Sequence, residues 1–231
     1  MSVPVCAAST LKDRLSRRTR ARCAATKLIA ASLGTLLLSG GCPPALQETP
    51  REETITLDVV FDRTGTLRSD GVFAPMTRGE LIGAGDSDEN RESRAFISLS
   101  LNTLPATANV TRVVLRFNAQ NVFGNPFSDF PACVVDHVNV VSGINAATFS
   151  EATITSQVAL IEPIPPLSAR DVEIDVTASV NADRAAGRPI SSFRVFFAQA
   201  PTVDGQSDGI VIRASPDNSA ARPSALVTIR S

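Results

Sequence analysis

Apolar and polar residues alternate along most of the chain after residue 53, which is the pattern of strands that bury one face. Residues 54–61 show it plainly, because Ile55, Leu57, Val59 and Phe61 all fall on one side. Residues 192–199 are instead apolar on both sides over part of their length, which predicts a central strand. Nine strands are predicted, at residues 54–61, 95–101, 111–117, 133–141, 153–161, 171–177, 192–199, 209–214 and 225–230.

Turn-forming residues separate these segments. Asp or Asn precedes Gly or Pro at Asp70-Gly71, Asn125-Pro126, Asp204-Gly205 and Asp208-Gly209. Residues 177–186, closed by Gly187 and Pro189, form the one segment that favours a short helix. Many short strands with a single short helix predict an all-β protein, built as an antiparallel β-sandwich of two sheets.

Charge divides the chain into two parts. Residues 1–41 carry seven lysines and arginines and a single aspartate, whereas residues 42–231 carry 15 arginines, no lysine and 22 acidic residues. The overall net charge of −1 therefore combines a basic start with an acidic body. An acidic body without a basic patch argues against nucleic-acid binding.

The basic start is followed by an apolar run at residues 28–38 and then by small residues. This order is typical of a secretory signal, and the run is shorter than the roughly 20 residues that span a bilayer. Leu38-Ser39-Gly40-Gly41-Cys42 resembles the lipobox of bacterial lipoproteins. The resemblance implies cleavage before Cys42 and acylation of its thiol and new amine. Pro43, rather than Asp, after the cysteine implies the outer membrane, on its periplasmic or its surface face. The alternative is a plain secretory signal with a cysteine near its cleavage region.

Residues 42–53 are polar and rich in proline, which predicts a tether between the membrane and a sandwich of residues 54–231. Cys6 and Cys23 lie in the predicted signal peptide of residues 1–41, and Cys42 is the predicted lipidation site. Cys133 is then the sole thiol of the mature chain, which leaves no intrachain disulfide. Its apolar neighbours predict a buried residue rather than a reactive one.

Several short motifs of the body follow one another in a recognisable order. They include Asp88-Glu89-Asn90-Arg91-Glu92-Ser93-Arg94, Gly124-Asn125-Pro126, Val135-Asp136-His137-Val138, Asp175-Val176-Thr177, Asp208-Gly209 and Arg222-Pro223. This order resembles the DNRLRE-type domain of secreted bacterial and archaeal proteins, over residues 54–231. The resemblance implies a jelly-roll-like β-sandwich, similar to carbohydrate-binding modules, that acts as an extracytoplasmic accessory or surface module.

One acidic turn has the residue types of a calcium site. Asp86, Asp88 and Asn90 place oxygen ligands at alternate positions, the spacing that calcium loops use. An EF-hand is excluded, because Arg91 stands at its glycine position and Ile97 at its final glutamate position. A structural calcium is therefore one interpretation of this turn, and a solvated acidic loop is the other.

The single histidine, His137, follows Asp136 within a predicted strand. A histidine beside a carboxylate is a candidate general base. Adjacent residues of a strand point to opposite faces, however, so Asp136 cannot orient His137 through a shared face. No nucleophile motif such as G-x-S-x-G accompanies the pair. The sequence favours a structural histidine.

Sugar binding has few candidate residues, because the chain has neither Trp nor Tyr for stacking on sugar rings. Phe123 and Phe127 are the candidates for that role, and the alternative is that they cap the core together with Phe130.

The sequence predicts a non-enzymatic envelope lipoprotein whose sandwich is an interaction or scaffolding module for an envelope protein. A carbohydrate-binding accessory module for extracellular polysaccharide is the alternative, and a hydrolase is the third interpretation.

Overall fold

The computed structural model describes residues 51–78, 81–140, 143–215 and 217–230, and within these ranges it contains twelve strands and two α-helices. The strands are β1 (Glu52–Asp58), β2 (Gly65–Arg68), β3 (Phe73–Pro75), β4 (Leu81–Gly85), β5 (Ser93–Ser100), β6 (Asn109–Phe123), β7 (Cys133–Val138), β8 (Thr153–Ile161), β9 (Arg170–Asp175), β10 (Ile190–Phe197), β11 (Gly209–Arg213) and β12 (Ser224–Arg230). The helices are α1 (Pro126–Asp129) and α2 (Thr177–Ala185). Short 3-10 turns lie at Phe61–Arg63, Met76–Arg78, Ala146–Ser150 and Ser219–Ala221.

The predicted fold class is confirmed. Each of the nine predicted strands corresponds to a strand of the structure, and the predicted short helix is α2. The boundaries of the first strand differ, because β1 begins at Glu52, within the predicted tether, and ends at Asp58. Phe61 was expected to continue that strand but lies in a 3-10 turn. The strands β2, β3 and β4 have no counterpart in the prediction, because three to five residues interrupted by Gly or Pro are too few to show alternation.

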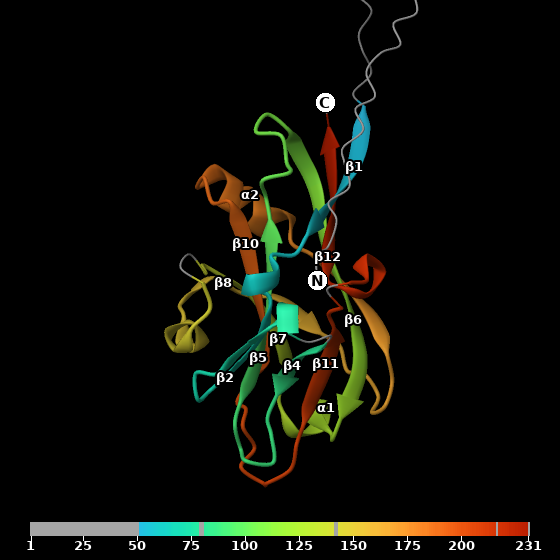
Figure 1. The fold of residues 1–231 in the computed structure, drawn as a ribbon. Coiled ribbons are helices and arrows are strands. Elements are labelled where there is room, and N and C mark those ends of the chain that lie inside the picture. The colour runs from blue at the N-terminus through green and yellow to red at the C-terminus, as the bar shows by residue number, and fades with distance from the viewer. Residues whose placement is uncertain (1–50, 79–80, 141–142, 216, 231) are drawn as a thin grey trace, which may run out of the picture. The chain divides into compact units, whose positions relative to one another are not determined.

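All strand pairs are antiparallel, and the long strand β6 pairs with three others, β9, β11 and β12 (Figure 1). The main path runs β1-β12-β6-β11-β4-β5-β10-β7-β8, with β9 on β6, β2 on β5 and β3 on β2. The 15-residue β6 pairs with β12 along its first part and with β11 near its end, with a shift of register in each pairing. This long bent strand lets one continuous sheet curl over itself, so that its two halves enclose the core.

The main core lies between the layers, and a second, smaller core lies outside one of them. On β10, Phe193, Val195 and Phe197 are buried in the main core. The intervening residue Arg194 is also buried, so β10 is covered on both faces and paired with β5 and β7 at its two edges. The predicted central position of this strand is confirmed. The second core comprises Leu67, Phe96, Val138 and Val140, with Phe73, Ile144 and Phe149 packed on it.

The predicted signal peptide of residues 1–41, the predicted lipidation site Cys42 and the predicted tether as far as residue 50 lie outside the described residues. Within the part of the chain that is described, no helix has the length and apolar character needed to cross a membrane.

Candidate functional site

Several of the candidate residues gather at one end of the sandwich, which we call the loop end. It consists of residues 86–92, 123–130 and 198–208, and it is the end that carries α1 in Figure 1. Asp86 joins two of these segments. Its Oδ2 accepts hydrogen bonds from the Thr202 backbone N (2.8 Å) and hydroxyl (3.0 Å), and its Oδ1 accepts one from the Asp208 backbone N (3.1 Å). The Asp86 carboxylate is 4% exposed, so it acts as a buried link between loops that are 116 residues apart or more.

A second buried carboxylate, Asp208, links this pair of loops to the third segment. Its Oδ1 accepts a hydrogen bond of 2.5 Å from the backbone N of Asn125, the residue before α1. Gly124 has φ +63°, and a Cβ there would stand 2.0 Å from Asp208 Oδ1. Only glycine fits this close approach. The Gly-Asn-Pro motif therefore serves to bring α1 against a buried carboxylate.

Carboxylates crowd together at the loop end. Burial raises the pKa of Asp208, the Asn125 backbone N–H lowers it, and the nearby charges of Asp129, Asp86 and Asp204 raise it further. The net direction is upward, because removal from water and like charges both disfavour the ionised form. Asp129 and Asp204 are themselves exposed, so the loop end presents a negatively charged surface.

The three candidate calcium ligands have separate partners in this structure. Both oxygens of Asp86 accept protein hydrogen bonds, and Asn90 Oδ1 accepts one of 3.1 Å from the Gly205 backbone N. Asp88 is exposed, and its backbone N donates to Ser207 Oγ at 2.9 Å. Across the described ranges, no group of three or more His, Cys, Asp or Glu residues could hold a metal ion. Calcium binding at this turn stays a prediction, and the observed role of the turn is to hold residues 202–208.

The two candidate stacking residues are half-buried. Phe127 packs against the main core, with its ring edge-on to Phe197 at a centroid distance of 5.3 Å. Phe130 is buried and lies 5.1 Å from the same ring. The Phe123 ring lies close to Gly209, where an added Cβ would come within 2.8 Å of it. The geometry of Phe127 and Phe130 is that of core caps, and sugar stacking on Phe123 and Phe127 stays a prediction.

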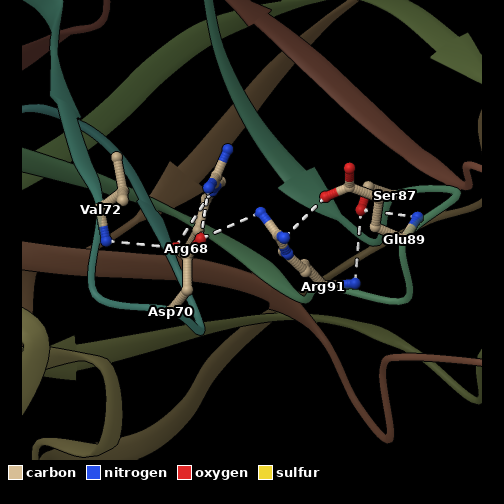
Figure 2. Close-up of polar contacts among 6 residues, drawn as sticks. All are labelled: Arg68, Asp70, Val72, Ser87, Glu89 and Arg91. Atoms are coloured by element: carbon tan, nitrogen blue, oxygen red, sulfur yellow. Dashed lines mark hydrogen bonds and ion pairs between the residues drawn. The ribbon is translucent and has the colours of Figure 1, made fainter.

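A chain of exposed charges connects the turn at residues 68–72 with residues 86–91 of the loop end (Figure 2). Arg91 bridges the two, with Nη1 3.2 Å from Asp70 Oδ2 and Nη2 3.0 Å from Glu89 Oε2. Arg68 forms a hydrogen-bonded ion pair with Asp70, which also accepts from the Val72 backbone N. The Arg68 hydrogen bond is the main reason that the pKa of Asp70 falls to about 2. This carboxylate therefore stays charged throughout the neutral range.

We expect this exposed network to contribute little to stability. The melting temperature of the Arg91→Ala variant should lie within about 2 °C of that of the parent. Solvent screening and the loss of side-chain entropy offset most of the attraction between exposed ions. Thermal unfolding followed by circular dichroism measures the difference, and 0.5 M salt should remove most of it by screening. A larger, salt-resistant loss would mean that Arg91 holds the loop by packing rather than by charge.

His137 is fully buried and belongs to a cluster inside the sandwich rather than to an accessible site. Its Nε2 lies 2.7 Å from Asp183 Oδ2 on α2, and its ring stacks on Phe193 at 5.6 Å. The other oxygen of Asp183 accepts from Arg188 Nη1 at 2.7 Å. Asp136 points to the opposite face, as strand alternation predicts, and pairs with Arg194 at 2.8 Å. A histidine with no exposed surface cannot meet a substrate, so its contacts point to a structural role.

The partner of His137, Asp183, was missed in the sequence, although a signal was present. Val176, Ser179, Val180 and Asp183 are all buried and repeat at the spacing of one helical face. An acidic residue on the buried face of a helix needs a polar partner. Burial acts to raise the pKa of Asp183, but the hydrogen bonds it receives, that from His137 foremost, outweigh it and hold the pKa below its usual value.

Cys133 is buried and free, as expected from its apolar neighbours. Burial raises the pKa of its thiol, because the thiolate would have no solvent. This thiol is therefore unreactive in the folded chain.

A comparison with known proteins returned no match to any protein-family model and none to a curated protein. The resemblance to the DNRLRE-type domain stays a prediction from the sequence.

Proposed function

We propose that this chain is a non-enzymatic lipoprotein of the cell envelope that displays its sandwich as an interaction or scaffolding module. Lipid on Cys42 would hold the module in the outer membrane, and the Pro-rich segment after it would act as the tether. The basic start, the short apolar run and the sequence Leu38–Cys42 support the anchor. Two or more acyl chains give stable attachment to a bilayer.

The loop end is the observation that best supports the proposed interaction module. Buried Asp86 and Asp208 fix three loops against one another, so that the surface they form is held in place before any partner arrives. Loops on a rigid scaffold are common binding surfaces, and a fixed surface loses less entropy on binding. Asp88, Glu89, Asp129 and Asp204 are exposed there, which suits an envelope protein that presents basic groups.

The anchor is tested by comparing two cysteine variants in a bacterial host. The Cys42→Ala variant should lose its lipid and move from the membrane fraction to the soluble fraction. Cys23→Ala is the matched control, because Cys23 lies in the predicted signal peptide and should not affect the mature chain. Immunoblots of the two fractions measure the distribution. A parent chain that is already soluble, or a Cys42→Ala variant that stays in the membrane, would contradict the proposed anchor.

A second candidate function is that of an accessory module that binds extracellular polysaccharide. One observation favours it, an open hollow of about 660 Å³ beside the C-terminal end of α2. Arginine and asparagine side chains line this hollow together with apolar residues, a mixture that suits a sugar. In Figure 1, α2 lies away from the end that carries α1, so this hollow and the loop end are separate surfaces.

A further inference from the structure

The hollow beside α2 has the size and the mixed lining of a small-molecule site. Its volume of about 660 Å³ falls within the range of about 300–1,000 Å³ that ligand pockets occupy. Its lining includes Asn102, Leu104, Asn181, Arg184, Arg188 and Pro189. Leu104 and Pro189 supply apolar surface, the two asparagines supply amides, and the two arginines supply guanidinium groups.

The charge of this hollow sets it apart from the rest of the acidic body. Its lining contains two arginines and no acidic residue. Three other hollows in the described residues each include at least one carboxylate, among them Glu173 in two and Asp175 in two. Arg188 is paired with the buried Asp183, whereas Arg184 donates to backbone oxygens, so the hollow beside α2 keeps a positive charge that attracts an anion. At the other hollows carboxylates stand among the lining residues and oppose one.

Both arginines are held in position by contacts on their protein side. Arg188 Nη1 lies 2.7 Å from Asp183 Oδ1, and Asp183 is itself buried and bound to His137. Arg184 Nη2 donates to the backbone oxygens of Pro105 and Ala108, both at 3.0 Å. Guanidinium groups that are already fixed lose little entropy when a ligand binds. The planar fork of an arginine also matches the two oxygens of a carboxylate.

We propose that this hollow binds the carboxylate-bearing ring of an acidic sugar, a uronic acid. The arginines would bind the carboxylate, the asparagine amides would bind ring hydroxyls, and Leu104 and Pro189 would contact the apolar edge of the ring. The inference rests on the second candidate function, polysaccharide binding. It names the place of binding and the class of sugar, and it assigns the buried cluster of His137 and Asp183 the task of positioning Arg188.

Calorimetric titration of the full chain tests the proposal. The probes are D-glucuronate, an oligomer of galacturonate, neutral D-glucose and inorganic phosphate. We expect binding of glucuronate and of the oligomer but not of glucose, with phosphate weaker than either. The monomer and the oligomer distinguish a free sugar acid from a polymer as the natural source. Phosphate that binds as tightly as glucuronate would overturn the proposal, because the hollow would then be a general anion site.

Variants locate the site. Arg188→Lys keeps the charge but loses the fork, and it should weaken uronate binding about tenfold or more. Asn102→Ala changes an exposed amide outside the buried cluster and should also weaken binding, which guards against a variant that merely unfolds. Arg170→Gln, at an exposed arginine of another hollow, is the control and should bind normally.

The possible failures are distinguishable. Uronate binding that survives both Arg188→Lys and Asn102→Ala would overturn this site while leaving polysaccharide binding in place. Binding of neither the monomer nor the oligomer by the parent chain would overturn this inference, and a neutral polysaccharide would then be the remaining ligand class for the second candidate function. The anchored interaction module would stand in both cases.

Discussion

The Asp183→Ala variant should lose about 3–5 kcal/mol of unfolding free energy, the cost of removing one partner from a buried ionic cluster. Asp183 is 1% exposed and accepts hydrogen bonds from His137 and from Arg188, both at 2.7 Å. Alanine would leave the imidazole N–H without an acceptor inside the sandwich and Arg188 without its anchor. Urea unfolding at pH 7, followed by circular dichroism, measures the loss.

Asp171→Ala is the matched control, because Asp171 is an exposed aspartate on β9. It should change the unfolding free energy by only about 0.5 kcal/mol. The pKa of Asp183 is lowered in the folded state, so its contribution is present above the unfolded pKa of about 3.9 and is lost as pH falls through the lowered folded value. The difference between parent and Asp183→Ala should therefore narrow in acid. If Asp183→Ala and Asp171→Ala lost the same unfolding free energy at pH 7, the structural role of Asp183 would be contradicted.

The Asp86→Ala variant should lose about 3 kcal/mol, because three hydrogen bonds to one buried carboxylate disappear together. The backbone N–H groups of Thr202 and Asp208 would lose their acceptor. We expect faster hydrogen exchange at these two amides in the native state, since the loop that contains them would open locally. Exchange measured by mass spectrometry on peptides from residues 198–209 reports this opening.

Asp88→Ala is the control for Asp86, because Asp88 is an exposed carboxylate of the same loop. Its free energy of unfolding should differ from that of the parent by no more than about 0.5 kcal/mol. An effect as large as that of Asp86→Ala would show that the loop end is held by charge in general rather than by the buried link.

The Asp88→Ala variant also tests the calcium prediction. A thermal shift with calcium that Asp88→Ala abolishes would confirm it, and no shift of the parent at saturating calcium would exclude it.

The sequence could predict the strands because most of them bury one face and therefore alternate regularly. Burial on both faces could be predicted as well, because the apolar residues on both sides of residues 192–199 correctly indicated the central strand β10. The short strands β2 and β4 could not be found in the same way. β2 is held by β5 and β4 is held along its length by β11, and the Gly83 backbone N also donates to Thr66 Oγ1, 17 residues away.

The candidate site was predicted less completely, because its contacts join distant parts of the chain. Asp86 was recognised as a polar residue in a turn, but its partner Thr202 lies 116 residues away and has no local signal. His137 was recognised as structural from strand alternation. Its partner Asp183 lies 46 residues away on a helix, and the two meet because α2 packs against β6 and β10. Alternation indicates which face a residue occupies but not which element covers that face.

The proposed lipid anchor is tested most directly by the mass of the mature N-terminal peptide. Mature protein should be purified from bacterial membranes, digested and examined by mass spectrometry. We expect the mature chain to begin at Cys42, with acyl chains on the sulfur and the amine of that residue. A mature chain that begins elsewhere, or one that begins at an unmodified Cys42, would contradict it.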